Sequence, residues 1–159
     1  MKKMKFLAEI QLGGFKTVEE LSKSLEKIKM DRIVTSFIPK VTICESQEKI
    51  YLFTVSATSL GFVDDFVKYK DIYTEAKKLG LGECSLKTSF LFHLQHNQQK
   101  GETMIIPTDM HAGDECSRAL NVMCDENGKS IKNELINTYR YYSSSQLFIF
   151  CKDDPLDPT

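Results

Sequence analysis

Short stretches in which β-branched, aromatic and other apolar residues dominate, or alternate with polar ones, recur along the chain, and each predicts a β-strand. The predicted strands are residues 5–12, 40–44, 49–62, 88–96, 103–106, 118–124, 130–136 and 145–151. The polar turn between residues 96 and 103 and the Asn-Gly pair at 127–128 predict two hairpins.

Two other stretches repeat their apolar residues at the spacing of an α-helix. In the first stretch, the apolar residues are Val18, Leu21, Leu25 and Ile28. Thr17 followed by Glu20 is a capping box, in which both side chains satisfy free backbone amides at the start of a helix. We therefore predict a helix over residues 18–29 with one buried face.

The second predicted helix ends just before Gly80. Its apolar face consists of Ile72, Ala76 and Leu79, and two lysines complement the negative C-terminal end of the helix. Gly80 suits the left-handed conformation that ends many helices, and Leu81 is placed to make the apolar contact that accompanies it.

These elements predict an α+β fold: an antiparallel sheet of about six strands with two helices packed on it, both in the N-terminal half. The 159 residues and 42% hydrophobic content suit one domain with one core. We assign residues 1–152 to that domain. Residues 153–159, with two prolines and few apolar side chains, are expected to be disordered.

Composition disfavours several classes of protein. The chain has 21 Lys and Arg residues against 22 Asp and Glu residues, so it has no overall positive electrostatic field that would attract nucleic acid or anionic lipid. A local basic patch is still possible. Glu9 and Gln11 interrupt the apolar run near the N-terminus, which is too short for a secretory signal, and no run approaches the ~18 residues of a membrane span. We expect a soluble, cytoplasmic protein with no membrane partner.

The five cysteines are Cys44, Cys84, Cys116, Cys124 and Cys151. They are odd in number and include no C-x-x-C pair, which argues against a disulfide framework or a zinc knuckle. Reduced, mostly buried thiols are expected.

Two of the three histidines, His93 and His96, lie three residues apart in the predicted strand of residues 88–96. An odd separation places two side chains on opposite faces of a strand, and only a helix would put this pair on one face. The spacing of Phe90 and Phe92 and the turn that follows favour the strand. We therefore expect no joint metal site, and His93 remains a candidate for ligand binding.

A second cluster of reactive residue types occupies residues 109–116. Asp109, His111 and Cys116 supply the types needed for a metal site or a Cys-His nucleophile, which requires a thiolate within hydrogen-bond reach of an imidazole. A solvated, glycine-containing loop after Pro107 explains the same residues. This loop is the leading catalytic candidate.

Two further motifs have both a structural and a functional interpretation. Residues 127–130 end like a phosphate-binding loop, but Met123 stands where that loop requires glycine, so a hairpin turn is preferred. The other motif could present rings and a cation to nucleotide bases, or form a half-buried loop or strand. It consists of Tyr139, Arg140, Tyr141 and Tyr142.

The order of features in residues 71–107 resembles a family of small bacterial hypothetical proteins. The matching residues are Ala76, Leu79, Gly80, Leu81, Cys84, Leu94, Gln95, Gly101 and Glu102, with residues 59–62 and 147–152 also similar. The resemblance covers most of the chain, but it implies no activity, so no catalytic residue follows from it. Some members are labelled helicase, although this chain has neither the phosphate loop nor the length of a helicase motor.

The chain departs from the family's pattern around the predicted strand of residues 88–96. Family members have a proline after the cysteine, then a Gly-Pro pair, an arginine and an aromatic residue. The corresponding residues here are Ser85, Ser89, Phe90, His93 and His96. If the family residues form a binding surface, this chain has lost or changed it.

The sequence contains no converging catalytic set. The leading hypothesis is therefore an intracellular binding or regulatory module with a protein partner, no metal and no cofactor. A small hydrolase or transferase using residues 109–116 is the first alternative. A single-strand nucleic-acid binder using residues 139–142 and nearby lysines is the second.

Overall fold

The computed structural model describes residues 3–43, 48–96, 98, 100–111 and 115–153, apart from the side chain of His111. Residues 154–159 of the predicted tail lie outside the described residues.

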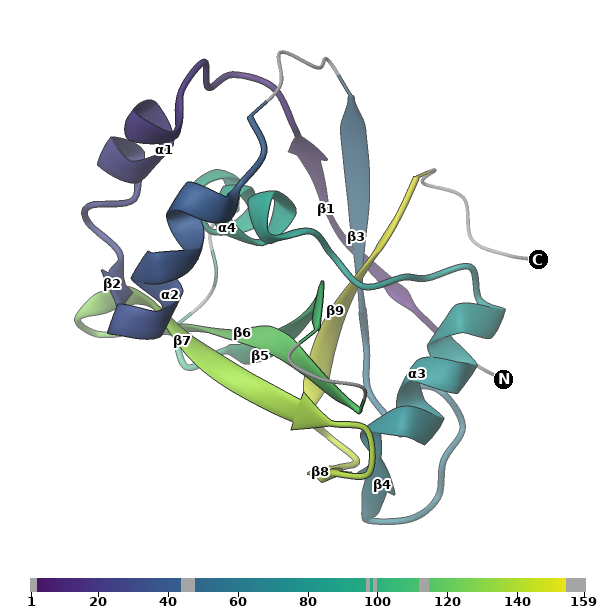
Figure 1. Ribbon diagram of the computed structural model, residues 1–159. Coiled ribbons are helices and arrows are strands. Elements are labelled where there is room, and N and C mark those ends of the chain that lie inside the picture. Colours follow the sequence, from purple (N-terminus) through teal and green to yellow (C-terminus); the bar gives the residue numbers. More distant parts are fainter. Residues whose placement is uncertain (1–2, 44–47, 97, 99, 112–114, 154–159) are drawn as a thin grey trace.

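The fold is α+β, as predicted (Figure 1). Its elements in chain order are β1 (Lys5–Gln11), α1 (Val18–Ser24), β2 (Lys29–Met30), α2 (Arg32–Phe37), the 3-10 helix η1 (Ile38–Lys40), β3 (Lys49–Val55), β4 (Phe66–Lys68), α3 (Tyr69–Lys78), α4 (Leu86–Gln95), β5 (Thr103–His111), β6 (Cys116–Asp125), β7 (Gly128–Asn137), β8 (Tyr141–Ser143) and β9 (Leu147–Lys152).

The main sheet has seven strands in the order β1-β3-β9-β5-β6-β7-β2, and β4 pairs separately with β8. Neighbouring strands of the main sheet are antiparallel except β5 with β9 and β2 with β7, which are parallel. The predicted, wholly antiparallel sheet of about six strands is wrong in these two pairings. Both join strands that are not consecutive in the chain, which local sequence patterns do not reveal.

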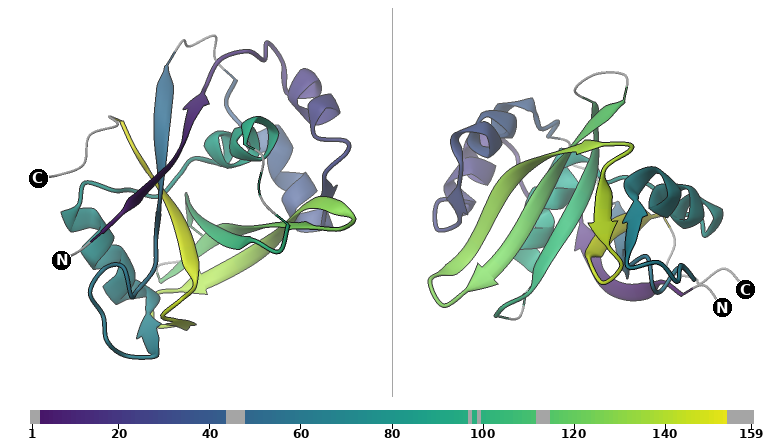
Figure 2. Two further views of the ribbon diagram at one scale, coloured as in Figure 1. Left: turned by 180° about the vertical axis from the view of Figure 1, so that it is seen from behind. Right: turned by 90° about the horizontal axis from the view of Figure 1, so that it is seen from below.

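Two layers cover the two faces of this twisted sheet (Figure 2). α1, α2 and α4 pack on one face, where Leu21, Val34 and Phe90 belong to one buried cluster. α3 and the β4-β8 pair pack on the other face, where Ile72 and Tyr142 belong to a second cluster. The described residues thus contain four α-helices where two were predicted, and none of these helices is long and apolar enough to cross a bilayer.

Helix α1 begins as predicted but ends earlier. The Thr17 hydroxyl accepts from Glu20 N at 3.1 Å, and the Glu20 carboxylate accepts from Lys16 N at 2.8 Å. Leu21 and Leu25 are buried, which confirms the core-facing side of the helix. After Ser24 the chain continues in tighter turns, so the predicted extension to residue 29 is wrong.

Helix α3 ends in the predicted motif. Gly80 has a φ of 82°, its N–H bonds to Lys77 O, and Leu81 N bonds to Ala76 O at 3.2 Å. This is the Schellman pattern, which satisfies two free carbonyls at a helix end. Leu81 is only 3% exposed and belongs to the same apolar cluster as Ala76 of the helix.

Helix α4 corrects the prediction of a strand over residues 88–96. Ser85 caps the helix by accepting from Thr88 N at 3.1 Å. Phe90, Phe92 and His93 are all buried, although they project from different sides of the helix. A helix that is buried all round shows no helical hydrophobic stripe, so its apolar run was interpreted as a strand.

Residues 82–84, which connect α3 to α4, fill the space where β5 and β9 part. Gly82 and Cys151 of β9 exchange two backbone hydrogen bonds of 2.9 Å. On the other side, Cys84 N donates to Pro107 O and Asp109 N donates to Cys84 O, each at 3.0 Å. The connector therefore links both strands, and it takes the place of direct β5-β9 pairing at this end of the sheet.

The remaining predicted strands have mixed outcomes. The hairpin of β6 and β7 is confirmed, with Gly128 at a φ of 110° in its turn. The predicted strand of residues 40–44 is wrong, because Lys40 ends a 3-10 helix, residues 41–43 form no strand, and Cys44 lies outside the described residues. The last strand is confirmed as β9.

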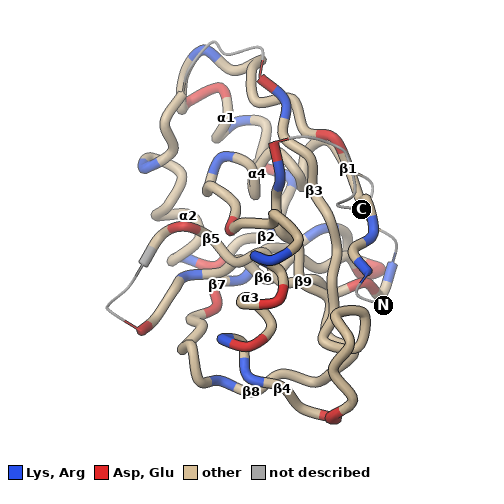
Figure 3. Tube along the Cα trace, turned by 90° about the vertical axis from the view of Figure 1, so that its right-hand side faces the viewer, with Lys and Arg blue, Asp and Glu red and all other residues tan. Residues whose placement is uncertain are grey.

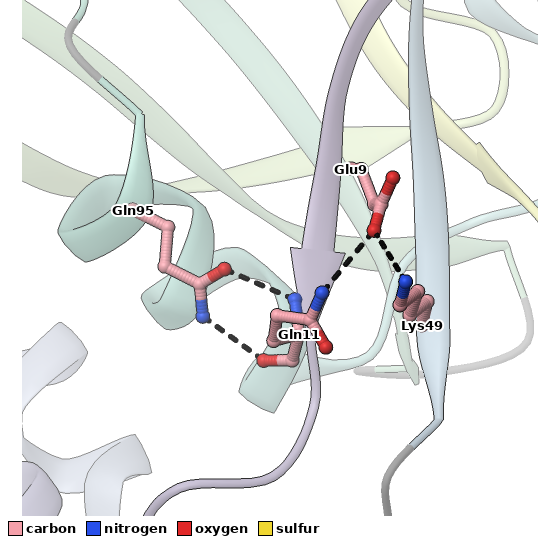
Figure 4. A network of polar contacts seen from close by, with 4 residues as sticks. All are labelled: Glu9, Gln11, Lys49 and Gln95. Carbon is pink, nitrogen blue, oxygen red and sulfur yellow. Dashed lines mark hydrogen bonds and ion pairs between the residues drawn. The ribbon is translucent and has the colours of Figure 1, made fainter.

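An edge strand exposes backbone groups that can pair with another chain, and the edge strand β1 is protected by α4. The Gln95 side-chain amide accepts from Gln11 N at 3.0 Å and donates to Gln11 O at 2.9 Å, as a neighbouring strand would (Figure 4). Glu9 lies beside this contact and forms an ion pair with Lys49 at 3.1 Å. A bulge interrupts the strand near its start.

Replacing Gln95 with Ala removes the hydrogen-bond partner of Gln11 N and Gln11 O and exposes both groups to water. We expect a loss of roughly 0.5–1.5 kcal/mol in the free energy of unfolding, together with concentration-dependent self-association. Urea denaturation and sedimentation velocity measure the two effects. Gln146→Ala, a change of the same residue type away from β1, is the control and should remain like the parent. A monomeric Q95A protein of parental stability would contradict this role.

Leu25 is 2% exposed, so Leu25→Ala should cost on the order of 2–5 kcal/mol of unfolding free energy. Thr17→Ala removes only the helix cap and should cost roughly 0.5–2 kcal/mol. Thermal melts of the two variants should therefore rank with L25A well below T17A. The opposite ranking would show that Leu25 does not contribute to the core.

Candidate functional site

The catalytic candidates of residues 109–116 do not lie in one loop. Asp109 and His111 belong to β5, which runs through Pro107, and Cys116 begins β6, so the predicted loop after Pro107 is wrong. Residues 112–114 between the two strands are outside the described part. Asp109 lies beside Cys84, whose backbone carbonyl accepts from Asp109 N at 3.0 Å. Among the described residues, no three His, Cys, Asp or Glu side chains are grouped to hold a metal ion.

The two histidines lie at the C-terminal end of α4, so their predicted placement on opposite faces of a strand is wrong. His93 is 1% exposed, and neither ring nitrogen makes a hydrogen bond of normal geometry. Burial lowers its pKa to about 4, the Lys129 charge acts in the same direction, and the nearby Ser130 backbone opposes them. His96 is half-buried and stacks on Phe92 with 4.9 Å between ring centroids.

Lys129, at the start of β7, has a structural role. Its ammonium donates to His93 O at 2.6 Å and to His96 O at 3.0 Å, two carbonyls at the C-terminal end of α4. A cation at this end offsets the negative pole of the helix and satisfies its free carbonyls. The lysine of the motif at residues 127–130 is thus bonded to the end of α4 and has a structural function.

The segment of residues 139–142 forms part of a two-stranded structure. β8 pairs with β4 in an antiparallel arrangement, and hydrogen bonds from Tyr69 N to Arg140 O (2.8 Å) and from Lys70 N to Thr138 O (2.9 Å) continue the pairing. We call residues 66–70 and 138–143 the tyrosine ribbon. It lies at the lower end of the molecule in Figure 1.

Alternate side chains of the tyrosine ribbon point away from the core. Tyr139, Tyr141 and Phe66 are 49%, 58% and 64% exposed. The Lys68 ammonium lies 5.6 Å from the ring centroid of Tyr141, and the Lys70 ammonium lies 5.6 Å from that of Tyr139. The outward face is therefore a row of aromatic rings, two of which carry an ammonium group over the ring.

The inward residues attach the ribbon to the sheet. Tyr142 lies opposite Val67 in the strand register, is 7% exposed, and meets the Phe148 ring edge-on at 5.1 Å. The Arg140 guanidinium lies 4.9 Å from the Tyr142 ring centroid and forms an ion pair of 3.1 Å with Glu134 of β7. The ribbon is thus anchored both by apolar packing and by a charged contact.

Burial changes the proton affinity of this anchor. It raises the pKa of the Glu134 carboxyl and of the Tyr142 hydroxyl, while the Arg140 charge opposes both shifts. Glu134 Oε2 and the Tyr142 hydroxyl are close to each other but make no hydrogen bond of normal geometry. Arg140 contacts both residues, through the Glu134 carboxylate and the Tyr142 ring.

An open pocket of about 390 Å³ lies beside the outward face. Its lining includes Phe66, Lys68 and Tyr141 of the ribbon together with Asp64 and Asp71. Figure 3 shows acidic and basic residues interspersed around β4, β8 and α3. The surface therefore combines aromatic rings with charges of both signs.

The structure brings together all four candidates of residues 139–142 but places His93 on the other side of the sheet. The sequence prediction missed Phe66, Lys68, Lys70 and Glu134. The alternation of Phe66, Lys68 and Lys70 around Val67 is a strand pattern, but it is short and runs directly into α3. Only the long-range pairing with β8 makes it part of a site.

No protein-family model, curated protein or solved structure matches the chain. The resemblance to small bacterial hypothetical proteins stays a prediction. The fold and the ribbon define an α+β protein with an exposed surface of aromatic rings and charges of both signs.

The low pKa of His93 makes stability depend on pH. Because the folded value of about 4 lies below the ordinary 6.5, the unfolded chain binds more protons between these values. Stability should therefore be highest above about pH 6.5 and fall as pH decreases toward 4, by on the order of 3 kcal/mol from this residue.

Urea denaturation of the parent and of His93→Leu at several pH values isolates this effect, because other titrating groups are common to both proteins. The difference in unfolding free energy should shift in favour of H93L as pH falls. Parallel pH profiles would contradict the assignment. His96→Gln is the comparison variant: burial lowers the pKa of His96 too, but His96 is only partly buried, so its pH profile should differ less from that of the parent.

Proposed function

We propose that the protein is a binding module and that the outward face of the tyrosine ribbon is its contact surface for a protein partner. The observation that carries the proposal is the row of exposed rings, Phe66, Tyr139 and Tyr141, on a ribbon fixed to the core. Single exposed apolar residues are common on protein surfaces, but an adjoining group of large rings is characteristic of interaction sites.

The residue types of this face suit a protein interface. Aromatic side chains and arginine are enriched in the centres of such interfaces, where they account for much of the binding energy. A tyrosine also loses little conformational entropy on binding, because its ring has few rotatable bonds. Here Lys68 and Lys70 each lie over one of the two exposed tyrosine rings.

The charges around the rings indicate the chemistry of the partner. Lys68, Lys70 and Arg140 lie on or next to the ribbon, and each is already placed over a tyrosine ring. A partner with carboxylates around an apolar centre complements this arrangement. Asp64 and Asp71, which line the neighbouring pocket, limit how far such acidic groups can extend.

Single-stranded nucleic acid is the second candidate, supported by the alternation of lysines and tyrosines. Proteins of that class stack bases on aromatic rings and track the phosphates with basic residues. In this ribbon the lysines lie over Tyr139 and Tyr141, where a base would stack, and Asp64 and Asp71 repel phosphates. These features favour the protein partner.

The test replaces both exposed tyrosines, Tyr139→Ser and Tyr141→Ser, in one variant. Quantitative affinity capture from a cell extract, followed by binding titrations with each captured protein, should show a roughly tenfold or larger loss of affinity. Ile33→Ser is the matched control, because Ile33 is 47% exposed and lies in α2 on the other face of the sheet. Far-ultraviolet circular dichroism checks that both variants fold.

Two outcomes would overturn the protein-partner proposal. One is equal loss of affinity in the control and the double variant. The other is tight, salt-sensitive binding of labelled single-stranded oligonucleotides that the double variant loses, which would establish the second candidate.

A further inference from the structure

Cys84 and Cys151 are neighbours in the fold although 66 residues separate them in the sequence. Gly82 pairs directly with Cys151, and two residues later Cys84 lies between β9 and β5. The Cys84 Sγ lies 4.0 Å from Ile149 O, and the Cys151 Sγ donates to Glu83 O at 3.2 Å. Each thiol therefore points toward the other's strand.

The two thiols differ in access. Cys84 is completely buried, whereas Cys151 is partly exposed. Each thiol also affects the proton affinity of the other: hydrogen bonding with Cys151 and burial raise the pKa of Cys84, whereas hydrogen bonding with Cys84 lowers the pKa of Cys151 against the opposing effects of burial, Asp153 and Asp109. Cys151 is thus both the accessible thiol and the one favoured to lose its proton.

We propose that Cys84 and Cys151 form a reversible disulfide when the protein meets a small-molecule disulfide such as glutathione disulfide. The geometry assigns Cys151 as the attacking thiol and Cys84 as the resolving thiol. The bond closes between the α3-α4 connector and the last strand of the sheet.

The reaction proceeds in two exchanges. The Cys151 sulfur, having released its proton to solvent, attacks one sulfur of the reagent, and one glutathione leaves as a thiolate that takes up a proton. The Cys84 sulfur then loses its proton and attacks Cys151 Sγ, expelling the second glutathione. Two protein thiols are oxidised to one disulfide, and one small-molecule disulfide is reduced to two thiols.

The fold makes this bond strained and therefore easy to reduce. Diagonal neighbours on paired strands have Cα atoms roughly 7–8 Å apart, which is beyond the roughly 4.4–6.8 Å that a disulfide usually spans, so the backbone must move for the bond to form. Closing the bond requires the connector to move toward β9, against its hydrogen bonds to Pro107 and Asp109. Strained disulfides have higher reduction potentials, as regulatory ones do.

Peptide mapping tests the assignment directly, because trypsin places each cysteine in its own peptide. The peptides are residues 41–49, 79–87, 101–118, 119–129 and 141–152. The reduced, folded protein is incubated with excess glutathione disulfide, free thiols are alkylated in denaturant, and the unreduced digest is analysed by mass spectrometry. The expected product links residues 79–87 to residues 141–152, with loss of alkylation at both cysteines.

Variants separate the two steps. Cys84→Ser should accumulate glutathione on Cys151, because no resolving thiol remains. Cys124→Ser, which removes a partly buried thiol of β6, should give the same link as the parent. The parent should lose the link when a mild excess of reduced glutathione is added.

Three results would overturn the proposal. In the parent, Cys84 could stay fully alkylated while Cys151 carries glutathione. Links to Cys116 or Cys124 could equal the Cys84–Cys151 link. Cys84→Ser could leave Cys151 unmodified, which would remove Cys151 as the entry point.

Discussion

The backbone hydrogen bonds that residues 82–84 make to β5 and β9 are the contact on which the two halves of the fold depend. α3 packs on one face of the sheet and α4 on the other, and the chain between them passes from face to face between β9 and β5. It can do so only where neighbouring strands part. Because backbone groups buried at that point need partners, the connector pairs with both strands. Leu81 joins one apolar cluster and Cys84 the other, so the crossing is also where the two cores meet.

Local signals predicted those elements whose ends and buried faces are set by neighbouring residues. The cap at Thr17 and the buried Leu21 and Leu25 agree with the sequence, as does the Gly80 end of α3. The same signals do not predict α4 as a helix, because burial on all sides removes the polar face by which an amphipathic helix is recognised in a sequence. Its cap at Ser85 was the remaining signal, and it lay just before the residues that resemble a strand.

The candidate site was predictable in composition but not in arrangement. Tyr139, Arg140, Tyr141 and Tyr142 are recognisable as an aromatic and basic group in the sequence. Their division into outward and inward residues depends on pairing with β4, and their attachment depends on Glu134 of β7. Contacts between segments so far apart in the chain leave no local pattern, and short strands such as β4 and β8 carry little signal of their own.

Helix α3 connects the tyrosine ribbon to the connector. Tyr69, the first residue of α3, lies in the ribbon's paired segment, and its hydroxyl donates to the Glu83 carboxylate of the connector at 3.0 Å. Tyr69 is 2% exposed, and burial raises its hydroxyl pKa, so the hydroxyl stays protonated and available as a donor. The Tyr69 ring stacks on Tyr73, which in turn stacks on Phe150 of β9. A shift of the connector relative to β9 therefore strains the buried Tyr69–Glu83 hydrogen bond and the stack of Tyr69, Tyr73 and Phe150. Because Tyr69 also belongs to the ribbon, the geometry of the connector and the geometry of the ribbon depend on each other.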